Sequence, residues 1–183
     1  NTFTVWDLER GRELRSLAGG HDENVTTVAV YDGGRQALLA SRDTPLKIWD
    51  LETGRELRTL TRNSCGVRAV AVDARGRRAI TISSDRTDRT LKVWNLELGR
   101  ELHTLEGHSG YINAVAVDRG GRRAISASND RTLRVWYLER GVSLAKFSGD
   151  MAFVTCAVTP DGRTFLAGDV GGKVHILHLE GLD

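Results

Sequence analysis

Between residues 100 and 138, the pattern of hydrophobic and polar positions is that of four short strands. Residues 100–105 alternate polar and apolar side chains, which is typical of a half-exposed edge strand. Residues 112–117 are apolar on both faces, which predicts a strand that is buried on both sides. Residues 122–128 and 132–138 also follow the period of a strand, and Gly-containing turns separate the segments. The stretch therefore predicts one four-stranded antiparallel sheet.

The same pattern recurs along the chain with a period of 41 to 45 residues. Tryptophans mark the period with gaps of 43, 45 and 42 residues, and Leu177 takes the next position, 41 residues on. These tryptophans are Trp6, Trp49, Trp94 and Trp136. Such a period indicates stacked or radial units that cannot bury their faces alone. One four-stranded sheet per period is a propeller blade, so we predict an all-β fold of about four β-propeller blades preceded by a single strand.

The chain resembles the WD-repeat (beta-transducin repeat) propellers over nearly all of its length. Three elements carry the resemblance: a Gly-His pair before the inner strand, an Asp in the turn between the second and third strands, and a closing Trp-Asp pair. They are Gly20-His21 and Gly107-His108; Asp43, Asp88 and Asp130; and Trp6-Asp7 and Trp49-Asp50. We expect a single segment, 1–183, with repeat units at about 9–51, 52–96, 97–138 and 139–180, and with 1–8 as the closing strand of a preceding repeat.

The resemblance implies a hydrogen-bonded chain of His, Ser or Thr, Asp and Trp inside each blade, since a buried Asp and a buried indole N–H both need partners. The third repeat has the whole set, whereas the first has Leu39 at the Ser position and the second has Asn63 at the His position. In the fourth repeat Asp150, Ala167, Gly171 and Leu177 replace all four, so we expect its blade to be the least rigid. The implied network residues are His21, Asp43, Trp49, Thr81, Asp88, Trp94, His108, Ser126, Asp130 and Trp136. We interpret them as structural residues.

The loops that enter the inner strands and the turns after the second strands lie on one rim of a propeller. Arg and Tyr, which are enriched at the centres of protein interfaces, are frequent at these positions. The predicted rim residues are Arg42, Arg62, Arg86, Arg89, Tyr111, Asn129 and Arg131. The hypothesis is that this rim receives an acidic peptide or protein segment, and the alternative is an ordinary solvated face.

One turn on this rim contains a three-residue duplication, Asp85-Arg86-Thr87 followed by Asp88-Arg89-Thr90. A loop of this kind could reach a partner, but surface loops also accept extra length at little cost. We favour the tolerated insertion.

Composition and motifs exclude several classes of function. A net charge of +2 from 26 basic and 24 acidic residues argues against a nucleic-acid binder that works by bulk charge, and no apolar run is long enough for a membrane helix. Cys65 and Cys156 form no CxxC pair, which predicts neither zinc nor a disulfide framework and favours a reducing, cytoplasmic compartment. We find no catalytic motif, and we expect no cofactor, no metal and no enzymatic activity in this stretch.

Counting strands predicts seventeen: two in a partial first blade, three complete blades, and three in a last blade. Four blades are too few to close a ring of this type, and an open arc would expose apolar faces. Either the chain is a segment of a longer protein or two copies form an eight-bladed ring. In the second case residues 12–17 of one copy could complete the last blade of the other.

These patterns predict a non-catalytic scaffold or sensor for protein partners. The Arg-rich repeats look like those of bacterial WD-repeat proteins, in which the propeller is often attached to a signalling kinase, protease or nucleotide-driven switch. The alternative is part of an enzyme whose catalytic residues lie outside this segment.

Overall fold

A computed structural model of the protein describes residues 2–18, 25–41, 45–60 and 66–180. These residues form seventeen strands in five antiparallel sheets of two, four, four, four and three strands, as predicted. The first two sheets contain β1 (Thr2–Asp7) and β2 (Arg12–Ala18), then β3 (Val25–Tyr31), β4 (Gln36–Ser41), β5 (Leu46–Asp50) and β6 (Arg55–Leu60). The third contains β7 (Val67–Val72), β8 (Arg78–Ser83), β9 (Leu91–Asn95) and β10 (Arg100–Leu105). The last two contain β11 (Ile112–Val117), β12 (Arg123–Ser128), β13 (Thr132–Tyr137) and β14 (Val142–Ser148), then β15 (Phe153–Val158), β16 (Thr164–Asp169) and β17 (Val174–His178). We number the three complete sheets blades 1 to 3 and the last sheet blade 4.

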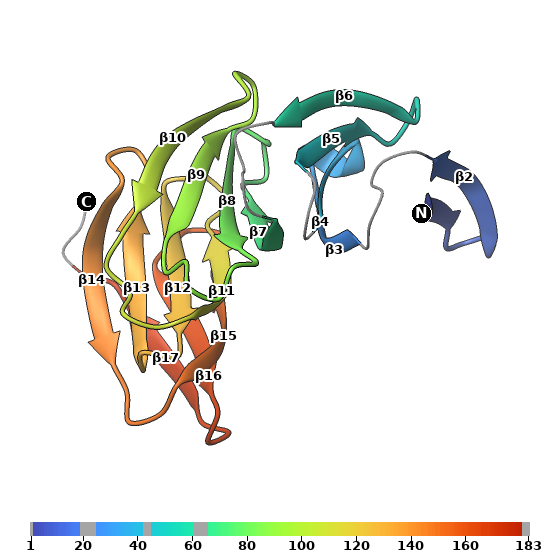
Figure 1. The fold of residues 1–183 in the computed structure, drawn as a ribbon. Helices are drawn as coiled ribbons and strands as arrows, with labels where there is room; N and C mark the ends of the chain where they lie inside the picture. The colour runs from blue at the N-terminus through green and yellow to red at the C-terminus, as the bar shows by residue number, and fades with distance from the viewer. Residues whose placement is uncertain (1, 19–24, 42–44, 61–65, 181–183) are drawn as a thin grey trace.

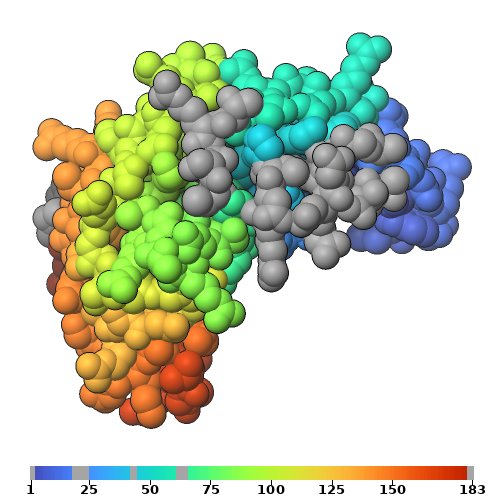
Figure 2. All heavy atoms as spheres, viewed as in Figure 1, coloured from blue at the N-terminus to red at the C-terminus, as the bar shows by residue number. Residues whose placement is uncertain are grey.

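The blades form an open arc, and the described strands do not close into a ring. The N-terminal sheet and the C-terminal sheet lie at opposite ends of the molecule (Figures 1 and 2). Strand β2 pairs with β1 of its own chain. The arrangement is therefore a set of propeller blades that leaves both end faces uncovered.

Apolar side chains fill the seams between neighbouring blades. Trp94 of blade 2 is buried among residues of blade 1, and Trp136 of blade 3 is buried among residues of blade 2. At the third seam, Phe153 and Phe165 of blade 4 pack on Ile125 of blade 3. The core is thus divided between seams, which explains why a single repeat cannot fold as a compact unit.

The inner strands are less buried than the sequence predicts. In β11 only Ile112 is fully buried, and the other five residues are half-buried. The prediction of burial on both faces was wrong because one edge and part of each face of an inner strand border the space inside the arc.

A β-bulge sits at the second residue of each inner strand, where the pairing register shifts. A bulge leaves one residue unpaired and redirects its side chain, here toward the next blade. The Thr26 hydroxyl donates to the Val67 carbonyl oxygen at 2.5 Å, and the Asn113 amide donates to the Phe153 carbonyl oxygen at 2.7 Å. The Arg68 guanidinium bridges the equivalent seam by donating to Asn113 O at 2.9 Å.

At the end of the seams away from the bulges, the turn between the first two strands of one blade contacts the preceding blade. Arg78 Nη1 donates to Gly121 O at 2.7 Å, and Arg123 Nη1 donates to Gly162 O at 3.3 Å. Gly121 has φ +66°, and a Cβ there would lie 2.4 Å from Asp73 Oδ2. Only glycine fits this contact without a shift, because the position is both left-handed and in close contact with the neighbouring blade.

Candidate functional site

Blade 3 contains an uninterrupted hydrogen-bonded chain of four side chains. Trp136 Nε1 donates to Ser126 Oγ at 2.8 Å, and Ser126 Oγ lies 2.7 Å from His108 Nε2. His108 Nδ1 lies 2.8 Å from Asp130 Oδ2, and the backbone N–H of Ser109 donates to the same oxygen. The second oxygen of Asp130 accepts from the N–H and the hydroxyl of Thr132. All of these groups are therefore satisfied inside one blade.

The direction of this chain requires a neutral imidazole. Because the indole N–H can only donate, Ser126 accepts from Trp136 and uses its own proton toward His108 Nε2. The Nδ1–H of His108 then donates to Asp130. Burial of His108 lowers its pKa below the ordinary value of 6.5, and this outweighs the opposite effect of the Asp130 carboxylate. A second proton on the ring would leave the Ser126 hydroxyl without an acceptor.

Asp130 stays ionised in this setting. Burial alone would raise its pKa, but hydrogen bonds from Thr132, His108 and the Ser109 N–H lower it from 3.8 to about 2. A neutral histidine and an ionised aspartate that are locked in a buried hydrogen-bond chain stabilise the fold, because neither side chain has an atom free for a substrate.

The predicted rim residues that the structure describes lie in or beside the turns at one end of these blades. Arg86 and Arg89 are exposed in the β8–β9 turn, and Asn129 and Arg131 are exposed in the β12–β13 turn. Tyr111 is half-buried just before β11, and its carbonyl oxygen accepts from the N–H of Asn129 at 2.8 Å. Tyr111 and Asn129 are thus directly joined, and the arginines extend outward from adjacent turns. Arg42 and Arg62 lie outside the described residues.

Arg131 has φ +64°, a left-handed conformation that favours glycine. The equivalent position in blade 4 is Gly172, with φ +82°. The long cationic side chain of Arg131 therefore stands on a strained backbone at the tip of this rim. Strained backbone conformations cluster at functional sites.

The duplicated turn is built from two copies of one capping unit. The N–H and hydroxyl of Thr87 both donate to Asp85 Oδ1 at 2.8 Å. Thr90 repeats these bonds on Asp88 Oδ1 at 2.9 and 2.7 Å. The inserted triplet thus satisfies its own backbone, which suits the interpretation of a tolerated insertion.

Two rim residues were missed by the sequence analysis. The Arg68 guanidinium lies 4.5 Å from the centroid of the Tyr111 ring, and Asn113 Nδ2 donates to Asn129 Oδ1 at 2.7 Å. Both residues belong to inner strands, whose pattern was read only for its apolar positions. A polar residue second in an otherwise apolar inner strand is the signal that would have found them.

The family model described as "WD domain, G-beta repeat" matches residues 54–95 and 99–137. Two WD40 repeats are thus detected in this part of the chain. WD40 domains are generally protein-interaction modules and are typically non-catalytic. We found no match to the chain among curated proteins. The bacterial source remains a prediction, since neither comparison indicates an organism.

The second blade, which contains most of the first matched WD40 repeat, keeps part of the side-chain network. Trp94 Nε1 donates to Thr81 Oγ1 at 3.0 Å, whereas the Asp88 carboxylate bonds to Thr90 rather than to a histidine. Asn63 lies outside the described residues, so the network is seen here only from Thr81 onward.

Blade 1 has an unsatisfied indole. Trp49 Nε1 is buried and has no hydrogen-bond partner among the described residues, and Leu39 is buried at the position that Ser126 holds in blade 3. His21 and Asp43, the other predicted members, lie outside the described residues.

Blade 4 has a different network from the WD40 pattern, and the sequence analysis missed it. Asp169 Oδ2 lies 2.9 Å from His175 Nε2, and Asp169 Oδ1 accepts from the N–H groups of Gly171 and Lys173. The hydrogen bond with His175 is the main cause that lowers the pKa of Asp169. The His175 ring also contacts Phe147 and Phe153, with centroids 5.7 and 5.1 Å apart. In place of the WD40 set, this blade thus contains an Asp–His pair of its own.

Metal and nucleophile chemistry find little support in the described ranges. There, no group of three or more His, Cys, Asp or Glu side chains is arranged to hold a metal ion. Burial raises the pKa of Cys156 to about 12, so this thiol is a core group, and Cys65 lies outside the described residues. Among the described residues, we find no helix with the length and apolar character that a membrane crossing requires.

We predict that Ser126→Ala lowers the free energy of unfolding by about 2 kcal/mol or more. The change leaves a buried indole N–H and a buried imidazole nitrogen without partners, and each orphaned group costs about 1–3 kcal/mol. Urea unfolding followed by tryptophan fluorescence measures the effect. Ser143→Ala is the matched control, because Ser143 is exposed and should change stability by less than about 0.5 kcal/mol. Equal effects of the two variants would contradict a stabilising role for the network.

We predict that stability falls in two steps as pH is lowered. The folded pKa of His108 lies below its unfolded value, so its contribution is complete above about pH 6.5 and declines as the unfolded chain takes up the proton. Asp130 adds a second loss below about pH 4, as its unfolded form protonates before the folded form does. Urea unfolding at a series of pH values measures both steps, and NMR of the imidazole nitrogens reports the protonation of His108. A His108 that is protonated in the folded protein at pH 6 would contradict this arrangement.

Proposed function

We propose that this chain is the interaction module of a signalling or regulatory WD-repeat protein, and that its basic rim binds an acidic segment of a protein partner. The basic rim is defined as Arg86, Arg89, Tyr111, Asn129 and Arg131. The observation that carries the proposal is that the acidic side chains beside these arginines are already engaged. Asp88 and Asp130 direct their carboxylates to Thr90 and Thr132, while the neighbouring arginines are exposed.

The shape of the rim also supports a peptide as ligand. Tyr111 is a half-buried aromatic side chain backed by Arg68, which gives it a fixed place among the exposed polar groups. Aromatic and arginine side chains contribute most to binding at protein interfaces. The cytoplasm is the compartment we expect for this module.

We predict that reversing three charges abolishes binding of an acidic peptide. The variant is Arg86→Glu, Arg89→Glu and Arg131→Glu, and the probe is a short fluorescein-labelled peptide rich in Glu and Asp, with a Lys-rich peptide for comparison. Fluorescence anisotropy should show that the dissociation constant rises more than about tenfold, because each lost ion-paired hydrogen bond is worth about 1.5–3 kcal/mol.

Arg55, Arg100 and Arg140 supply the matched control, since they are exposed at the opposite ends of the strands. The same reversal at these three positions should leave binding unchanged. Equal losses in the two triple variants, or equal binding of the acidic and the Lys-rich peptide, would mean that the rim is an ordinary solvated face.

We further propose that the end faces of the arc are covered in the working protein, by more blades of the same chain or by a second copy. Val174 and Ile176 are 70 % and 61 % exposed on blade 4, whereas Leu133 and Val135 at the equivalent positions of blade 3 are buried against blade 4. Trp6 is 55 % exposed at the other end, although the equivalent tryptophans are buried. Exposed apolar faces of this kind mark interfaces.

Light scattering of the chain, with Val174→Lys plus Ile176→Lys as the comparison, tests this proposal. A dimer of about twice 20.1 kDa that the double variant converts to monomer indicates a second copy. A wild-type chain that self-associates without a defined size, when the double variant does not, indicates that further blades cover the face. A stable monomer with the same melting temperature as the double variant would contradict the proposal.

A further inference from the structure

The rim opposite the basic rim contains two adjoining hollows. The first, which we call the tyrosine hollow, has a volume of about 470 Å³ and lies between blades 1 and 2. Its lining includes Tyr31, Gln36, Ile48, Leu57, Leu96 and Glu97. The second, the arginine hollow, has about 500 Å³ and is lined by Arg75, Arg77, Arg119 and Arg122 together with Pro160. Arg75 and Arg77 line both hollows, so the two hollows adjoin each other at these side chains.

The tyrosine hollow exists because blade 1 departs from the repeat at two positions. Where blades 2 and 3 have Asp73 and Asp118, which bond to the N–H groups of their own turns, blade 1 has Tyr31. Where blades 2 and 3 have arginines that cross the seam, blade 1 has Gln36, and it forms no such bond among the described residues. The arginine that bridges the seam from blades 2 and 3 is thus replaced by the shorter Gln36 in blade 1, and space remains between blades 1 and 2.

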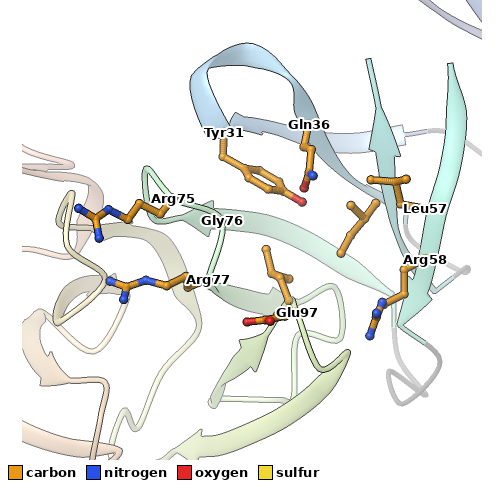
Figure 3. A pocket seen from close by; sticks show the side chains of 10 residues that line it. Tyr31, Gln36, Leu57, Arg58, Arg75, Gly76, Arg77 and Glu97 are labelled. Atoms are coloured by element: carbon orange, nitrogen blue, oxygen red, sulfur yellow. The ribbon is translucent and has the colours of Figure 1, made fainter. Parts of the chain in front are cut away.

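Tyr31 places an unused hydrogen-bond donor in this space. The residue is only 4 % exposed, its hydroxyl has no partner among the described residues, and Figure 3 shows the ring extending into the hollow. Gly76 of the next blade fixes the ring, because a Cβ there would lie 2.2 Å from it. Burial, and secondly the nearby Asp32, raise the pKa of Tyr31 to about 12, so the phenol keeps its proton at neutral pH. A buried donor without a partner costs about 1–3 kcal/mol, which a ligand acceptor would recover.

The arginine hollow concentrates positive charge. The described acidic side chains form no ion pair with Arg75, Arg119 or Arg122, whose side chains are exposed. Asp73 and Asp118, which precede these turns, are buried and bonded to backbone N–H groups, while Asp161 beside Pro160 is exposed and accepts from the Thr159 hydroxyl and the Arg163 N–H. In Figure 3 the head groups of Arg75 and Arg77 point away from the Tyr31 hydroxyl. Arg77 Nη2 donates to the Gly120 carbonyl oxygen at 3.2 Å, and the guanidinium groups of the other three arginines are suited to an oxyanion.

We propose that the two hollows form one binding site for an organic oxyanion, with its phosphate or carboxylate in the arginine hollow and its apolar body in the tyrosine hollow. Ile48, Leu57 and Leu96 offer apolar surface for that body, and the Tyr31 hydroxyl donates to an acceptor on it. Arg58 and Glu97 both line the tyrosine hollow and oppose each other in charge, whereas four arginines and no acidic residue line the arginine hollow, which favours the anionic end there. The site is separate from the basic rim, so it does not depend on the peptide proposal.

Calorimetric titration of the whole chain with inorganic phosphate, 4-nitrophenyl phosphate and 4-nitrobenzoate tests the site. We expect saturable binding of a nitrophenyl probe, tighter than that of inorganic phosphate. Whichever of the two organic probes binds more tightly identifies phosphate or carboxylate as the preferred anion. The absence of saturable binding of either organic probe would overturn the proposal.

Two variants separate the parts of the site. Arg75→Gln with Arg122→Gln should weaken all three probes by about tenfold or more, and Tyr31→Phe should weaken only the nitrophenyl probes, by about fivefold. Tyr31→Phe should leave the melting temperature unchanged or raise it, since it removes an unpartnered hydroxyl. Arg86→Gln with Arg89→Gln on the basic rim is the control and should bind all probes normally. Equal weakening by the two arginine pairs, or a Tyr31→Phe variant that binds the nitrophenyl probes like the wild type, would overturn a two-part site.

Discussion

In blades 1 to 3, the bulge at the second residue of the inner strand ties each blade to the next. It removes one residue from the pairing of its own sheet and turns that side chain to the next blade, where a carbonyl oxygen accepts a hydrogen bond. Thr26, Arg68 and Asn113 differ in size and charge, yet each makes this bond across its seam. In these three blades the position therefore holds a donor, whatever its residue type. At the other end of each seam a glycine allows the turn to approach the preceding blade closely.

The two rims of the arc use their arginines differently. On the basic rim the arginines stand in turns whose aspartates cap the following threonine, so the charges project outward from short, self-satisfied loops. On the opposite rim Arg78 and Arg123 are used as ties, Arg77 both bonds to Gly120 across the seam and lines the hollows, and the remaining arginines of the arginine hollow form no such tie among the described residues. The same residue type is thus structural where it crosses a seam and available for a ligand where the seam leaves a gap.

The repeat phase made most of the fold predictable, because each strand occupies the same place in every period. It also located Leu39 where a serine was expected, and the buried indole N–H of Trp49 is indeed without a partner in the described structure. The Asp169–His175 pair could not be predicted in this way, since neither residue stands at a network position of the repeat. The two hollows were equally hidden, because Tyr31 ends β3 of blade 1 and Arg75 lies in a turn of blade 2, and these two places meet only in the folded chain. Periodicity thus predicts what repeats, and the departures from it required the structure.

The face of blade 4 differs from the interior seams in a way that bears on what covers it. The bulge residue there is Val154, which has no donor, and the position of the crossing arginines is held by Thr164, whose hydroxyl bonds to His178 in its own sheet. Neither of the ties that join the interior blades can form from these residues. Contacts on this face must therefore come mainly from apolar side chains such as Val174 and Ile176. An interface without directional bonds tolerates more variation in the angle of its partner than an interior seam does. For that reason, if an element covers blade 4, the step between the two need not repeat the geometry of the three seams before it.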